Sequence, residues 1–170
     1  MLEGFYPGEY LDSTYQIDYR KLYQEGYRGV IFDIDNTLVP HGEPSDQRSD
    51  ALFKMLHEIG WHTIVLSNNK EPRVKMFATQ AGTDYIYKAG KPGKDGYEHA
   101  MKQMGTNPQN TLFVGDQIFT DIWGANRVGI RTILVKPIHP KEEIQIVLKR
   151  YLEKIVLFFY RRKLKKEGTV

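Results

Sequence analysis

The sequence contains no cysteine and no long apolar run. A chain without cysteine has neither disulfide bonds nor thiolate metal ligands, which is typical of a cytoplasmic protein. No segment approaches the roughly 18 consecutive apolar residues of a membrane-spanning helix. The first residues also lack the basic and then apolar segments of a signal peptide. We therefore expect a protein that is neither secreted nor inserted across a membrane.

Charge is unevenly distributed along the chain. The 170 residues include 24 Lys and Arg against 21 Asp and Glu, a net charge of +3. The basic excess lies in residues 141–170, whereas residues 1–140 are slightly acidic. A chain of this length with 41% hydrophobic residues is expected to form one globular domain. We therefore assign residues 1–140 to a folded domain and residues 141–170 to a basic amphipathic C-terminal helix and tail.

One stretch combines a buried strand with acidic residues. Residues 29–32 are apolar and too few for a helix, so they predict a strand of a parallel sheet. Asp33, Asp35 and Thr37 follow directly, and the two-residue period of a strand places the two carboxylates on one side. In such a pair, one carboxylate can attack a phosphorus atom while the other transfers protons. The alternative is a strand that ends in a polar turn.

Three further predicted strands also end in residues suited to binding an anion or a cation. Ser67 follows the strand at 63–66, and Lys91 projects from a Gly- and Pro-containing turn after the strand at 84–87. Asp116 and Asp121 follow the strand at 111–114 and could bring carboxylates to a hard cation such as Mg²⁺. The alternatives are helix N-capping by Ser67 and Asp116 and a solvated loop lysine at Lys91.

The order of the predicted elements indicates an α/β fold. A fifth strand is expected at 132–135, residues 1–11 read as an irregular arm, and helices alternate with the strands. Strands that alternate with helices form a parallel sheet covered on both faces, in three layers, and ligands bind at the carboxyl ends of its strands. The polar residues listed above all fall at that edge. The expected helices cover about 18–25, 46–59, 71–81, 96–104 and a segment that ends near 127.

These motifs resemble those of the haloacid dehalogenase (HAD) superfamily, a Rossmann-like fold. Asp33-Ile-Asp35-Asn-Thr37, Ser67-Asn-Asn, Lys91-Pro and Gly115-Asp116 with Asp121 occur in the order and approximate spacing of its four motifs. The connections after the first and second motifs are too short for a cap domain. The chain therefore resembles the capless subfamily IIIA, with a central parallel sheet of about five strands.

The resemblance implies a role for each motif residue in a phosphatase. Asp33 would be the nucleophile that forms an aspartyl-phosphate, and Asp35 would be the general acid and base. Thr37, Ser67, Asn68 and Lys91 would bind the phosphoryl group, with Lys88 a possible rival to Lys91. Mg²⁺ would be held by Asp33, the carbonyl of Asp35 and Asp116, with Asp121 in support.

The C-terminal segment combines an apolar stripe with basic residues, as an interfacial helix does. A final helix packed on the sheet, a dimer contact and RNA binding are the alternatives. The stripe contains Ile144, Val147, Leu148, Tyr151, Leu152, Ile155, Val156 and Phe159, and the basic run is Arg161-Arg-Lys163-Leu-Lys165-Lys166.

Within the subfamily, the chain is similar to bacterial YqeG-type proteins and, through them, to mitochondrial phosphatidylglycerophosphate phosphatases. The resemblance implies that the substrate is the anionic phospholipid phosphatidylglycerophosphate, with phosphatidylglycerol and inorganic phosphate as products. The basic amphipathic C-terminal segment indicates peripheral contact with the inner face of the cell membrane. No nucleic-acid partner is expected, because no stacking pattern accompanies the basic run. Two other classes stay open. One is a soluble phosphatase of nucleotides or sugar phosphates, and the other is a binding or assembly factor without turnover.

Overall fold

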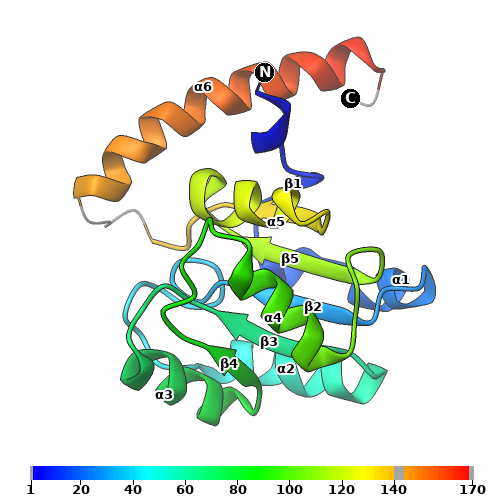
Figure 1. Cartoon of the computed structure of the whole chain (residues 1–170), viewed down its shortest axis with the longest axis vertical. Coiled ribbons are helices and arrows are strands. Elements are labelled where there is room, and N and C mark those ends of the chain that lie inside the picture. The colour runs from blue at the N-terminus through cyan, green and yellow to red at the C-terminus, as the bar shows by residue number, and fades with distance from the viewer. Residues whose placement is uncertain (1, 140–143, 169–170) are drawn as a thin grey trace.

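The computed structural model describes residues 2–139 and 144–168 and contains one parallel β-sheet (Figure 1). The strand order is β1-β6-β5-β2-β3-β4, so β2 lies between β5 and β3. The strands are β1 (Glu9–Leu11), β2 (Gly29–Phe32), β3 (His62–Leu66), β4 (Asp84–Ile86), β5 (Thr111–Gly115) and β6 (Arg131–Val135). The helices are α1 (Tyr19–Gln24), α2 (Gln47–Ile59), α3 (Glu71–Ala81), α4 (Asp95–Met104), α5 (Trp123–Arg127) and α6 (Ile144–Lys166). Three short turns complete the list: η1 (Glu3–Phe5), η2 (Thr14–Gln16) and the π-helical turn η3 (Ile118–Ile122).

The predicted α/β class is confirmed, but the prediction of about five strands is wrong. The sixth strand, β1, lies in the segment that we expected to be an irregular arm, and it pairs in parallel with β6 at the edge of the sheet. Three residues are too few to show the two-residue alternation that identifies a strand. Its partner can be recognised only once the chain has folded.

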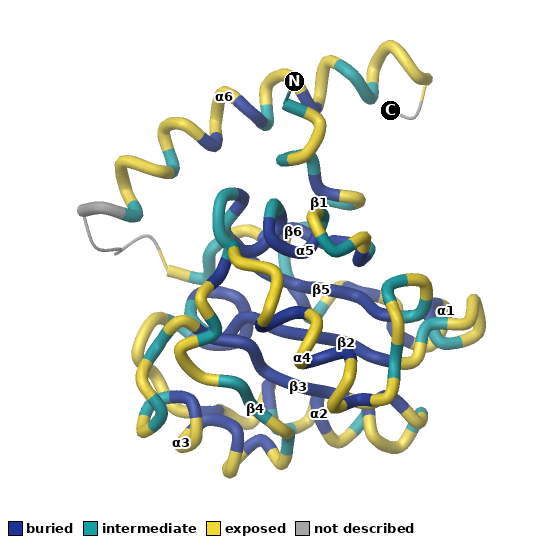
Figure 2. Tube along the Cα trace, viewed as in Figure 1, coloured by how far each residue is buried: buried dark blue, intermediate teal, exposed yellow. Residues whose placement is uncertain are grey.

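The sheet is covered by helices on both faces, because its central strand is apolar on both sides (Figure 2). Val30 and Phe32 point into a core that includes residues of α1, α2 and α3. Ile31, between them, points into a second core that includes residues of α4 and α5. This alternation is the period of an extended chain. The three layers leave the carboxyl ends of the strands facing the loops that carry the motifs.

The boundaries of α2 follow from its sequence. Asp46 accepts a hydrogen bond from the Ser49 backbone amide, and the Ser49 hydroxyl accepts one from the Asp46 amide, so the two form a capping box. Gly60 ends the helix with φ of 112°, a left-handed conformation that favours glycine. The short connection between β2 and α2 thus leaves no room for an inserted domain within residues 33–46.

Helix α6 crosses one end of the molecule, and much of it is exposed (Figures 1 and 2). Its exposed side carries large apolar side chains. Val156 and Tyr160 face the body and are buried. We call Leu148, Leu152, Ile155 and Phe159 the outward stripe; they recur at helical spacing and are 43–67% exposed. The proposed domain boundary at residues 140–141 and the side chain of Ile144 lie outside the described residues. No helix within the described residues is long and apolar enough to cross a membrane.

A pair of phenylalanine substitutions tests this assignment of buried and exposed faces. Phe53→Ala empties a fully buried position of α2, and we expect it to lower the free energy of unfolding by about 3–5 kcal/mol. Phe158→Ala, at an exposed position of α6, should change it by less than about 0.5 kcal/mol. Urea unfolding followed by circular dichroism measures both. Equal losses from the two variants would contradict the exposed position of Phe158.

Candidate active site

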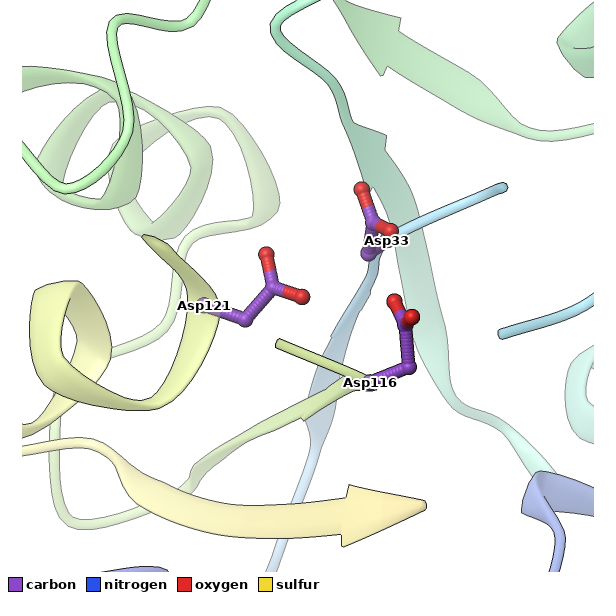
Figure 3. A group of neighbouring side chains, drawn as sticks. All are labelled: Asp33, Asp116 and Asp121. Carbon is purple, nitrogen blue, oxygen red and sulfur yellow. The ribbon is translucent and has the colours of Figure 1, made fainter. Parts of the chain in front are cut away.

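Three aspartates meet at the carboxyl edge of the sheet (Figure 3). Asp33 follows β2 and Asp116 follows the neighbouring strand β5, while Asp121 lies in the turn η3. All three are buried, and one carboxylate oxygen of each lies within 4.8 Å of the others. Adjacent parallel strands end side by side, which is why residues more than 80 positions apart in the chain can meet here.

Gly115, the last residue of β5, makes room for Asp121. A Cβ atom on this glycine would lie 2.5 Å from Oδ2 of Asp121 and 2.7 Å from its Cβ. The same carboxylate accepts a hydrogen bond at Oδ2 from the Gln117 amide at 3.1 Å. The π-helical turn therefore packs its acidic side chain directly against the strand end, in agreement with the occurrence of such turns at functional sites.

Lys91 lies between two of the carboxylates. Its Nζ donates to Oδ1 of Asp33 at 2.6 Å and to Oδ1 of Asp121 at 2.7 Å, and the side chain is almost entirely buried. Burial alone would lower the pKa of Lys91, but Asp121 and Asp33 raise it above its ordinary value, so the amine stays charged. Lys88, the possible rival, is exposed.

Asn68 fixes the main chain that presents Lys91. Its side-chain amide donates to the Lys91 carbonyl at 3.0 Å, and its side-chain oxygen accepts from the Lys91 amide at 2.8 Å. The two hydrogen bonds connect the loop after β3 to the loop after β4. A residue that we expected to bind phosphate is therefore engaged in holding the lysine loop.

The buried carboxylates have raised pKa values. Burial, followed by the charge of Asp121, raises the pKa of Asp33 to about 7, against the opposing effect of Lys91. Burial and the charges of Asp33 and Asp121 raise the pKa of Asp116 well above its usual range, although Arg150 acts in the opposite direction. A site with this excess of negative charge favours a bound cation.

Both carboxylate oxygens of Asp116 have partners. The Thr37 hydroxyl donates to Oδ1 at 3.1 Å, and the Arg150 guanidinium donates to Oδ2 at 2.5 Å. Arg150 also donates to the Asp116 carbonyl and pairs with Glu153 one turn further along α6. Thr37, in the loop after β2, therefore contacts the group of three aspartates, which we call the acidic group, and the C-terminal helix contacts the same group through Arg150.

Asp35 is close to Asp33 in the cavity but does not belong to the group of three carboxylates. Its oxygens accept hydrogen bonds from the side chains of Asn69 at 2.6 Å and Arg73 at 2.8 Å, and from the Gly42 amide at 2.8 Å. Three donors on one carboxylate fix its direction. The strand ends at Phe32, so a turn rather than the expected strand geometry sets the relation between Asp33 and Asp35.

The site opens into a cavity of about 230 Å³. Ser67 lies buried at its wall, where its hydroxyl accepts a hydrogen bond from the Asn69 amide at 3.1 Å. Ser67 does not occupy the N-cap position of α3, which belongs to Lys70. The cavity is lined by Asp33, Asp35, His41, Ser67, Asn68, Asn69, Lys91, Gln117, Thr120, Asp121, Ile146 and Lys149.

Sequence reasoning missed three residues at the site. Asn69 was within a quoted motif but had no assigned role, and Arg73 and Arg150 carried no local signal at all. Arg150 lies on a helix whose basic residues we interpreted as a membrane-facing set. Helical spacing does not separate Arg150 from the exposed lysines, because Lys154 lies four residues after it on the same side of the helix.

The donor set fits Mg²⁺. The three carboxylates offer hard oxygen ligands, and Mg²⁺ is typically bound by a few carboxylates together with water and phosphate oxygens. No histidine belongs to this group, and the chain has no cysteine. A softer metal such as zinc would find none of its preferred nitrogen or sulfur ligands in the three-carboxylate group.

Residues 46–129 match the family model for haloacid dehalogenase-like hydrolases. The Bacillus subtilis protein named "Probable phosphatase YqeG" is 34% identical over 165 residues, which cover 96% of each chain. A phosphatidylglycerophosphate phosphatase of Arabidopsis thaliana is 31% identical over 166 residues. That alignment covers 88% of this chain but 45% of the plant protein, so the likeness concerns about half of the plant protein's length.

Solved structures share the fold at low sequence identity. A HAD phosphatase from Thermococcus onnurineus aligns with a TM-score of 0.53 at 13% identity, over 69% of this chain and 90% of its own. A HAD family hydrolase from Deinococcus radiodurans aligns with a TM-score of 0.55 at 15% identity, over 73% and 87% of the two chains. These similarities support the architecture described above.

The raised pKa of Asp33 predicts a pH-dependent gain in stability from Asp33→Asn. Near pH 8, in buffer with a metal chelator, the ionised side chain is buried beside Asp121, so its neutral replacement should raise the free energy of unfolding by about 1–3 kcal/mol. As the pH falls through about 7 toward 4, Asp33 becomes protonated in the folded state, and the gain should disappear.

Urea unfolding at a series of pH values measures this difference. The exposed Asp84→Asn is the matched control and should show no pH-dependent gain. A difference between wild type and Asp33→Asn that grew toward pH 4 would contradict the assignment.

Proposed function

This chain belongs to the haloacid dehalogenase-like hydrolases and is a phosphatase, and we propose that it hydrolyses a phosphomonoester through a covalent intermediate on Asp33 with the help of Mg²⁺. The observation that carries the proposal is the meeting of Asp33, Asp116 and Asp121 beside the buried Lys91 amine, next to a cavity that Asp33, Asp121 and Lys91 help to line. A nucleophilic carboxylate, a cation site and a fixed positive charge are what phosphoryl transfer requires.

In the proposed reaction, a carboxylate oxygen of Asp33 attacks the phosphorus and the bond from phosphorus to the leaving oxygen breaks. Asp35 gives its proton to that leaving oxygen. Water then attacks the phosphorus of the aspartyl-phosphate, Asp35 takes a proton from the water, and the bond to Asp33 breaks to release inorganic phosphate. The three donors on Asp35 keep its carboxylate directed while its protonation state changes.

Asp33, Asp116 and the main-chain carbonyl of Asp35 are the proposed ligands of Mg²⁺, with Asp121 in support. The ion supplies positive charge that favours the ionised nucleophile and draws electron density from the phosphoryl oxygens. Lys91 would add a second positive charge beside Asp33. Its position between Asp33 and Asp121 supports this role because the amine is held by both carboxylates.

The hydroxyl groups of Thr37 and Ser67 and the Lys91 amine are the proposed contacts of the phosphoryl group. Thr37 and Ser67 are buried beside the acidic group and at the cavity wall. Asn68 contributes by fixing the Lys91 main chain, and the residue is also part of the cavity lining. Short hydrogen bonds to charged phosphoryl oxygens are stronger than those between neutral groups.

The proposed substrate is phosphatidylglycerophosphate, presented by an anionic membrane to a peripherally bound protein at its inner face. The plant relative named for that activity is one support, and the cavity without an inserted cap is a second. The third is α6, whose outward stripe is flanked by the exposed Lys149 and Lys154. Each basic residue near an anionic leaflet contributes on the order of 1 kcal/mol to membrane binding.

Loss of the nucleophile and removal of the metal test the chemistry. We expect Asp33→Asn to lower phosphate release from vesicles that contain phosphatidylglycerophosphate by at least about a thousandfold, because no covalent intermediate forms. EDTA should abolish the activity and added Mg²⁺ should restore it. Asp84→Asn, at an exposed edge position, is the control. Full activity of Asp33→Asn would favour a binding factor whose phosphate release comes from a contaminant.

The outward stripe tests the substrate class. Leu148→Asp combined with Ile155→Asp places two negative charges on the exposed side of α6 without touching the cavity. We expect vesicle turnover to fall at least about tenfold, while hydrolysis of soluble p-nitrophenyl phosphate stays unchanged. Vesicle sedimentation measures the lost binding directly. A similar loss of both activities would count against a membrane-presented substrate and favour a soluble one, and so would the retention of both activities.

A further inference from the structure

Arg150 brings a positive charge from α6 onto one of the proposed metal ligands. Its guanidinium donates to Oδ2 and to the main-chain carbonyl of Asp116, and the side chain is only 16% exposed. Asp116 lies after β5 in the sheet, so this contact joins the C-terminal helix to the centre of the site. None of the four sequence motifs contains Arg150.

The Arg150 guanidinium and a bound divalent cation would both interact with the Asp116 carboxylate. Oδ1 of Asp116 accepts from the Thr37 hydroxyl and Oδ2 accepts from Arg150. A cation bound by Asp116 would therefore share an oxygen that already accepts a hydrogen bond. It would also lie near the positive charge of Arg150, and charges at such short separations inside a protein interact strongly.

We infer that Arg150 is a positioning residue that opposes metal binding, so that docking of the near half of α6 and occupation of the metal site weaken each other. The inference rests on the proposed metal site and adds the regulation of that site by the helix. The coupling is reciprocal by thermodynamic necessity: if Arg150 lowers the affinity for the cation, the cation lowers the stability of the Arg150 contact to the same extent.

The contacts of α6 allow its two halves to respond differently. Near its start, Arg150 is held on Asp116, and Glu153 accepts a hydrogen bond from the Ile118 amide at 2.7 Å. Further along, the ring of Tyr160 lies 5.6 Å from that of Tyr6, and Lys163 pairs with Glu3 at 3.3 Å. The far half therefore has contacts that do not involve the acidic group. Loosening by metal should concentrate in residues 146–154.

Calorimetric titration of the full chain with MgCl₂ tests the inference without reference to turnover. Arg150→Gln removes the charge and should lower the dissociation constant for Mg²⁺ about tenfold or more, because Coulomb repulsion is relieved and an oxygen of Asp116 is freed. Arg150→Lys keeps the charge and should stay within about threefold of wild type. Lys154→Gln, which replaces an exposed lysine of the same helix, is the matched control and should leave the dissociation constant for Mg²⁺ unchanged.

Hydrogen exchange provides the reciprocal measurement. Saturating Mg²⁺ should speed exchange of the backbone amides in residues 146–154 of the wild-type protein, and Asp116→Asn should remove that response. An Arg150→Gln protein that binds Mg²⁺ as wild type does, or more weakly, would overturn the inference, as would no binding by either protein or unchanged exchange in α6. If the wild type turned over vesicle substrate but Arg150→Gln did not change the affinity for Mg²⁺, the inference about Arg150 would fail and the proposed function would stand. If Arg150→Gln bound Mg²⁺ more tightly but the wild type showed no turnover, the inference would stand and the proposed function would fail.

Discussion

The buried contact between Lys91 and the carboxylates of Asp33 and Asp121 is the interaction on which the site depends. One amine pairs at 2.6 and 2.7 Å with acids delivered by two different elements, the end of β2 and the turn η3. Without it, three buried carboxylates would face one another in a medium that stabilises charge poorly. Other parts of the site support this contact. Asn68 fixes the main chain of Lys91, and Gly115 and the π-helical turn η3 bring Asp121 against the end of β5.

Much of the fold was predictable because its central elements carry clear local signals. Val30, Ile31 and Phe32 form a short run that is apolar on both faces, as a central parallel strand requires, and Asp46 and Gly60 mark the ends of α2. Residues 9–11 carried no such signal, because a three-residue edge strand is defined by its partner β6. At the site, the gathering of Asp33, Lys91, Asp116 and Asp121 followed from the shared edge of parallel strands. The contacts of Arg73 and Arg150 depend on how helices pack, which neither spacing nor composition fixes.

The C-terminal helix combines two of the alternatives raised by its sequence. It packs on the body through Val156 and Tyr160, as a final helix of the domain would, yet it exposes Leu148, Tyr151, Leu152 and Phe158. On its packed side it also presents a charged pair, Arg150 and Glu153, that reaches the acidic group and the turn η3. The helix therefore holds to the domain partly through polar contacts and keeps much of its apolar surface available. Such a helix can connect binding at its exposed apolar surface with changes at the aspartates beside the cavity.

The edges of the sheet determine where other molecules can attach. Its two outermost strands, β1 and β4, are each three residues long and each begins with an acidic residue, Glu9 or Asp84. Short and charged edges give a foreign strand little to pair with, which is how natural sheets resist joining edge to edge into aggregates. Growth of the sheet from one copy into the next is therefore blocked at both margins. Self-association of this chain, when its concentration is high and lipid is absent, should occur through the exposed apolar side chains of α6, which include Tyr151, Phe158 and Phe159, and should be reversed by detergent.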